Sequence, residues 1–84
     1  ENMNQKVYLV FVLIEYSSES IMDAHYVFSS LEKAQDYMRQ QIAEARENFN
    51  MESGSFGIDK PLCQDWSNDC GQGYTIGVEE LTVL

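Results

Sequence analysis

Positive charge is scarce in this sequence. Its 84 residues include 5 lysines and arginines against 14 aspartates and glutamates, so the formal net charge is −9. A protein that neutralises nucleic-acid phosphates needs many cations, and this deficit argues against nucleic acid as a partner. It also disfavours binding to an anionic membrane surface. Such an excess of acid ordinarily keeps a protein soluble.

A long apolar segment and an export signal are also lacking. The longest apolar run covers residues 7–14, well short of the roughly 18 residues that a transmembrane helix needs. No basic segment precedes this run and no small-residue cleavage site follows it, so it does not match a signal peptide. From the sequence we therefore expect a cytoplasmic protein that does not enter a membrane.

Residues with chemical reactivity are few. The chain holds two cysteines, Cys63 and Cys70, and a single histidine, His25. Two cysteines are too few for a disulfide scaffold, and six residues separate them where redox and zinc pairs usually have two. We expect free thiols, although a bridge across a hairpin stays open. His25 has no evident nucleophile or orienting group beside it, so we expect no catalytic residue, no cofactor and no metal site.

What the chain does possess is a charge-free apolar run, Val-Tyr-Leu-Val-Phe-Val-Leu-Ile, at residues 7–14. Successive side chains of a strand point to opposite faces, so a half-buried strand alternates apolar and polar residues. This run does not alternate, which indicates a strand whose two faces both avoid water.

Two strands and a helix are predicted in the first half of the chain. Residues 6–16 form the first strand, which pairs antiparallel with a second strand at residues 24–28 through a polar, serine-rich loop. Ser29-Ser30-Leu31-Glu32 matches a capping box, in which the serine and the glutamate bond reciprocally to backbone N–H groups. The helix should end near residue 50. Its apolar stripe consists of Leu31, Ala34, Met38, Ile42, Ala45 and Phe49, with Tyr37 at its edge.

The second half is less regular. Residues 51–57 predict a loop, and residues 58–66 are compatible with a short strand that Pro61 would confine to a sheet edge. Residues 74–83 predict the last strand. A β-bulge near Glu79-Glu80 would keep Leu81 and Val83 on the same face as the apolar residues before them. Without a bulge, both faces of this strand are partly apolar.

The predicted architecture is a single α+β domain over residues 1–84. Its elements follow in the order strand, strand, helix, optional strand, strand. An antiparallel sheet of three to four strands with one long helix on one face makes a two-layer sandwich.

Several segments together carry a resemblance to a known group of proteins. They are Val7-Tyr8-Leu9-Val10, Val27-Phe28-Ser29-Ser30, Leu31-Glu32-Lys33-Ala34 with Tyr37, and the closing Tyr-Thr-Ile-Gly-Val-Glu-Glu at residues 74–80. The pattern resembles small uncharacterised α+β domains of bacteria and phages, in which a strand hairpin, a capped helix and a final strand make the whole protein. The resemblance covers most of the chain except about residues 51–72. It implies no catalytic residues.

A single helix can cover one face of the first strand, so something else must cover the other face. We predict a non-enzymatic protein-interaction module that forms a homodimer through the sheet face opposite the helix. Edge-to-edge pairing of strands is another route to the same dimer. Two alternating sets of side chains compete for this role, Val7, Leu9, Phe11 and Leu13 on one face and Tyr8, Val10, Val12 and Ile14 on the other. We predict the second set as the interface. We add Trp66 to it, because this aromatic residue lies beside a loop and outside the periodic segments.

Two other classes of function are weighed against this prediction. An acidic inhibitor or decoy of the phage type would bind a basic surface of a partner protein, and it requires the acids to gather on one face. An enzyme requires a pocket with convergent polar groups, which these residues do not suggest. We therefore expect no enzymatic activity.

Overall fold

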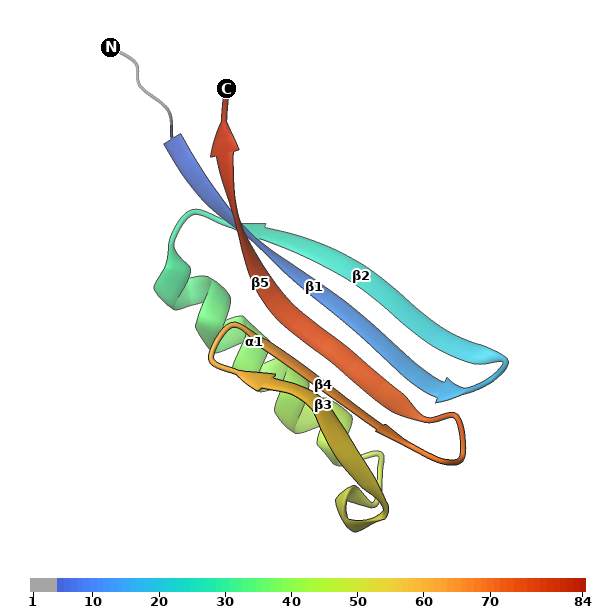
Figure 1. Cartoon of the computed structure of the whole chain (residues 1–84). Helices are drawn as coiled ribbons and strands as arrows, with labels where there is room; N and C mark the ends of the chain where they lie inside the picture. The colour runs from blue at the N-terminus through green and yellow to red at the C-terminus, as the bar shows by residue number, and fades with distance from the viewer. Residues whose placement is uncertain (1–4) are drawn as a thin grey trace.

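The apolar run lies in strand β1 (Gln5–Ser17), inside a five-stranded antiparallel sheet of order β2-β1-β5-β4-β3. The computed structural model describes residues 5–84, and one helix packs against one face of this sheet (Figure 1). The fold is therefore α+β with five strands, where the sequence predicted three to four. The remaining elements are β2 (Ser20–Phe28), helix α1 (Leu31–Arg46), the short 3-10 helix η1 (Met51–Ser53), β3 (Gly54–Lys60), β4 (Cys63–Asn68) and β5 (Gly73–Val83).

The β1–β2 hairpin confirms the predicted antiparallel pair. It is longer than predicted, because the serine-rich loop shrinks to a turn at residues 18–19 and β2 begins at Ser20. Ser17 stabilises this turn, since its hydroxyl accepts a hydrogen bond of 3.2 Å from the backbone N–H of Glu19. The polar residues at 20–23 therefore continue the strand.

Helix α1 begins after Ser30, whose side chain accepts a hydrogen bond of 3.1 Å from the backbone N–H of Lys33. A serine caps the helix as predicted, but it is Ser30 and not the Ser29 that the predicted box requires, so the third helical position holds Lys33 and not Glu32. In a capping box, the side chain at this position accepts a hydrogen bond from the backbone N–H of the cap residue. A lysine side chain has no acceptor, so this second bond cannot form here. The helix ends at Arg46, and the side-chain amide of Asn48 donates to the backbone carbonyl of Glu44 at 3.0 Å. The capped end is a few residues earlier than predicted.

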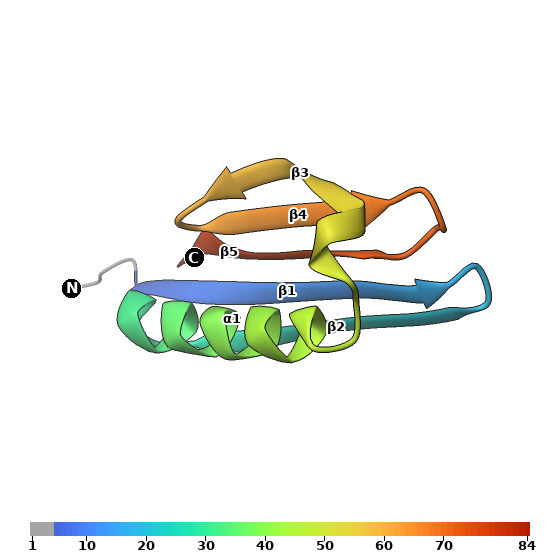
Figure 2. The ribbon, with the colours of Figure 1, turned by 90° about the horizontal axis from the view of Figure 1, so that it is seen from below.

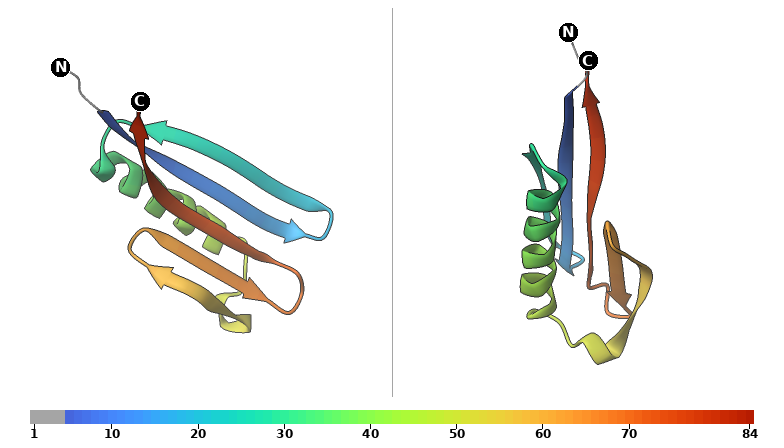
Figure 3. Two further views of the ribbon diagram at one scale, coloured as in Figure 1. Left: turned by 45° about the horizontal axis from the view of Figure 1, so that its top comes forward. Right: turned by 90° about the vertical axis from the view of Figure 1, so that its left-hand side faces the viewer.

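The core lies between the helix and one face of the sheet (Figure 2). From the predicted helical stripe, Ala34, Met38, Ala45 and Phe49 are buried, while Leu31 stays partly exposed. The sheet contributes Val10, Val12, Ile14, Trp66, Tyr74, Ile76 and Val78. Figure 3 shows the helix on one side of the β1–β5 pair.

The β3–β4 hairpin overturns the prediction of a loop over residues 51–57. Pro61 and Leu62 form its turn, so the proline lies outside the strands and removes no ladder bond. Gly54 lies in β3, and this position requires glycine because a side chain there would overlap the Trp66 indole and the Ser67 carbonyl. The glycines that suggest a loop therefore mark a close approach of two strands.

Strand β5 has no bulge at Glu79-Glu80. Its pairing with β1 runs without a shift from Gln5–Val83 to Glu15–Gly73. Leu81 therefore lies on the face opposite that of Val78, and both faces of β5 are partly apolar. Glu79 and Glu80 therefore point to opposite faces.

Replacing Gly54 with alanine tests the packing of the β3–β4 hairpin. The new methyl group meets the Trp66 ring and rigid backbone, so we expect G54A to lower the free energy of unfolding by about 1–3 kcal/mol. G57A is the matched control, because a methyl group there meets only the flexible Asp65 carboxylate, at 3.1 Å. Its effect should stay below about 1 kcal/mol in urea unfolding. Equal losses in both variants would contradict this packing.

Candidate functional site

The alternation of β1 divides its apolar residues between two environments. Even-numbered residues face α1, and odd-numbered residues lie on the other side, where the sheet carries no helix (Figure 3). We call this second side the open face. Its apolar residues, placed by the strand register, are Val7, Leu9, Phe11 and Leu13 of β1, Ile21 and Val27 of β2, and Leu81 and Val83 of β5.

The predicted interface set lies on the other face and requires correction. Val10, Val12, Ile14 and Trp66 are at most 3% exposed beneath the helix, and Tyr8 is half-buried beside them. A second copy cannot reach these side chains while the helix is in place. The competing set, Val7, Leu9, Phe11 and Leu13, is the one on the open face.

The neighbours of β1 explain which face the helix covers. On the helix side β1 is flanked by Met22, Ala24 and Tyr26 of β2. On the open face the neighbours of β1 include Asp23, His25 and Glu79. Covering these polar and charged groups would cost free energy, so the helix packs on the other side. The alternation of β2 is the sequence signal that could have identified the face.

The open face is apolar yet in contact with solvent. Val27 and Ile21, six positions apart along β2, are 64% and 56% exposed, and with the apolar residues of β1 they form one exposed apolar surface. The β1 residues beneath them are half-buried. The missing bulge in β5 adds Leu81 and Val83 to the same surface.

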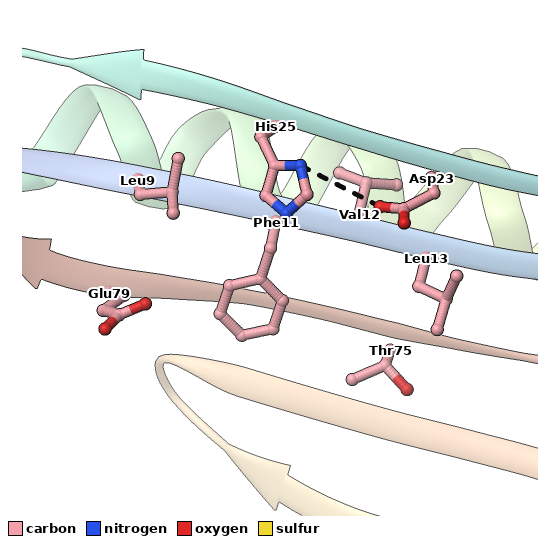
Figure 4. A pocket seen from close by; sticks show the side chains of 8 residues that line it. All are labelled: Leu9, Phe11, Val12, Leu13, Asp23, His25, Thr75 and Glu79. Atoms are coloured by element: carbon pink, nitrogen blue, oxygen red, sulfur yellow. Dashed lines mark ion pairs between the residues drawn. The ribbon is translucent and has the colours of Figure 1, made fainter.

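A shallow groove of about 300 Å³ crosses the middle of the open face (Figure 4). The ring of Phe11 forms part of its floor and lies over Gly77, where any side chain would collide with the ring. The residues that line the groove are Leu9, Phe11, Val12, Leu13, Asp23, His25, Thr75 and Glu79.

The polar groups of the groove do not converge on one point. His25 Nδ1 lies 3.9 Å from Asp23 Oδ1, and both side chains are more than half exposed. Thr75 comes from β5, on the far side of β1 from His25, and its hydroxyl donates to Asp65 Oδ2 at 2.8 Å. Within residues 5–84 no group of three side chains has the composition and spacing to hold a metal ion.

Both cysteines are free thiols. Cys63 begins β4 and Cys70 follows its end, so the length of the strand separates them. The register pairs Cys63 with Gly77, which places its side chain on the open face. Burial raises the pKa of the Cys63 thiol, and the nearby Asp65 carboxylate raises this pKa further.

Comparisons with known proteins leave the identity of this surface open. No family model, curated protein or solved structure matches the chain. The resemblance to small bacterial and phage α+β domains therefore stays a prediction. Among the described residues, no helix has the length and apolar character needed to cross a membrane.

Alkylation of the two thiols tests the surroundings of Cys63. Only the thiolate reacts, so a raised pKa lowers the reactive fraction at a given pH. In dilute protein near pH 8 we expect Cys63 to react with iodoacetamide several times more slowly than the exposed Cys70. Mass spectrometry of the labelled peptides gives both rates. A faster reaction at Cys63 than at Cys70 would contradict the half-buried position of Cys63.

Proposed function

We propose that this protein is a non-enzymatic interaction module that forms a homodimer by packing its open face against that of a second copy. The observation that carries the proposal is the uncovered apolar surface on one side of the sheet, with Val27 and Ile21 as its most exposed members. The scattered polar groups of the groove support an interaction surface better than a reaction site.

The dimensions of the molecule suit such a contact. The protein measures 52 × 24 × 18 Å, so its broad side has room for the roughly 800 Å² that each partner buries in a standard interface. Two sheets pack face to face about 10 Å apart, with their side chains interdigitating. Completing the burial of the four half-buried β1 side chains would contribute about 3–6 kcal/mol before the costs of association.

An acidic inhibitor that binds a basic partner is the second candidate. Asp23 and Glu79 line the apolar groove, and they would suit a partner that carries cations beside an apolar strip. The acids of the helix support this candidate less, because Lys33, Arg39 and Arg46 lie among them, and Arg39 pairs with Asp36 at 2.6 Å. We therefore prefer self-association.

A matched pair of leucine variants tests the face contact. Leu81 on the open face and Leu31 at the start of the helix are 37% and 38% exposed. The proposed contact buries Leu81 but not Leu31. We therefore expect L81Q to weaken self-association by at least about tenfold and L31Q to leave it unchanged. Sedimentation equilibrium measures the association, and urea unfolding checks that both variants fold. A wild-type protein with the mass of one 9.7 kDa chain throughout the micromolar range would contradict the proposal.

Salt separates the two candidate functions. Each copy carries a net charge of −9, so two copies repel one another and screening should strengthen their association. Raising NaCl from about 0.1 M to about 1 M shortens the Debye length from about 10 Å to about 3 Å. We expect the homodimer to tighten over this range, as measured by sedimentation. An acidic inhibitor would instead lose affinity for a basic partner, and self-association that weakens with salt would count against the open-face dimer.

A further inference from the structure

Strand β2 forms one edge of the sheet, and little protects it from pairing with another strand. It is 9 residues long and contains no proline and no lysine. Its register with β1 is unbroken from Tyr8–Phe28 to Glu15–Ile21. Natural proteins usually block such an edge with a bulge, a proline or a lysine, because its free backbone groups can pair with another chain.

The opposite edge shows these protective features. Strand β3 has an irregularity between Phe56 and Ile58 in its pairing with β4. It ends at Lys60 and is followed directly by Pro61. The contrast between the two edges indicates that β2, and not β3, is available for pairing.

We propose that β2 pairs antiparallel with β2 of a second copy, around a two-fold axis that passes through Ala24. Ala24 is the midpoint of Ser20–Phe28, so this register gives all 9 residues of the strand a partner. The two sheets then join edge to edge into one continuous sheet, with their open faces on the same side.

The side chains of β2 match one another in this register. Residues at equal distances from Ala24 lie opposite each other, so Ile21 meets Val27 of the second copy, and the symmetry repeats the contact. These are the two most exposed aliphatic side chains of the strand, at 56% and 64%. Asp23 likewise meets His25 of the second copy, so a carboxylate faces an imidazole on each side of the axis. Apolar pairs of this kind stabilise neighbouring antiparallel strands, and an imidazole N–H can donate a hydrogen bond to the carboxylate opposite it.

Other registers lose this match. An axis perpendicular to the sheet brings residues of the same face opposite each other, so it passes through a residue. An axis through Asp23 places two carboxylates directly against each other, which is destabilising. An axis through His25 places Asp23 against the aliphatic Val27. Only the axis through Ala24 combines full-length pairing with an imidazole opposite each carboxylate.

The edge contact is separate from the proposed face contact and does not depend on it. One uses the backbone of β2, and the other uses side chains across the sheet. If both form, two joined sheets pack face to face in a closed assembly of four chains. The two contacts therefore need different experiments.

A cysteine at the axis tests the register. In a C63S/C70S background, A24C should form an intermolecular disulfide under mild oxidation, because the residue on the axis faces its own counterpart. D23C is the matched control, since its counterpart is two residues out of register and lies beyond the roughly 7 Å Cα separation that a disulfide can bridge. Non-reducing electrophoresis should show twice the 9.7 kDa chain mass for A24C alone. Absence of cross-linking in A24C, or stronger cross-linking in D23C, would overturn the register.

A charge exchange tests the same contact without changing Ala24. H25D places a carboxylate opposite Asp23 on both sides of the axis and should weaken edge pairing by at least about tenfold. The double variant D23H/H25D again places an imidazole opposite each carboxylate, with the wild-type composition, so it should recover the association. Both are measured by sedimentation in the L81Q background, where the face contact is weakened. An H25D variant that associates like its parent, or a double variant as weak as H25D, would refute the pairing.

Discussion

The sheet has two apolar faces and a single helix, which can cover only one of them. The rest of the structure depends on this constraint. Strand β1 carries large apolar residues on both sides, whereas α1 covers only the even-numbered ones. The neighbouring strands decide which side is covered, because Asp23, His25 and Glu79 lie beside the odd-numbered residues. A helix over those polar and charged groups would have to desolvate them. The open face is thus the side that residues 5–84 leave without a covering layer.

The covered side is closed by aromatic packing at the end of the helix. Phe49 and Tyr74 each stack with the Trp66 ring, with centroid separations of 5.6 and 6.2 Å. Gly54 lets β3 approach this ring, so the β3–β4 hairpin is held to the rest of the sheet through the core. A turn contact adds to this, since the backbone N–H of Val78 donates to the carbonyl of Leu62 at 2.8 Å. The hairpin widens the sheet, and the helix covers no more of it.

The sequence predicts the elements whose pattern is local. The apolar run, the antiparallel hairpin and the capped helical stripe all follow from spacing, and the structure contains each of them. Strand β3 is missed because its need for Gly54 comes from Trp66, which lies 12 positions away and is brought near by the fold. The covered face is missed because β1 does not alternate, so the choice lies with residues on β2 and β5. Trp66 was predicted on a surface because its core partners Phe49 and Tyr74 are outside its own segment.

We propose that a second copy covers the open face. The side chain of Cys63 lies on this face, so its reactivity depends on whether the face is covered. The most direct measurement is the alkylation rate of Cys63 relative to Cys70 in the wild-type protein, followed from nanomolar to high micromolar concentration. The account predicts that the Cys63 rate falls as the protein associates, while the rate of the exposed Cys70 stays constant. A ratio of the two rates that does not change with concentration, in a sample whose mass shows association, would contradict it.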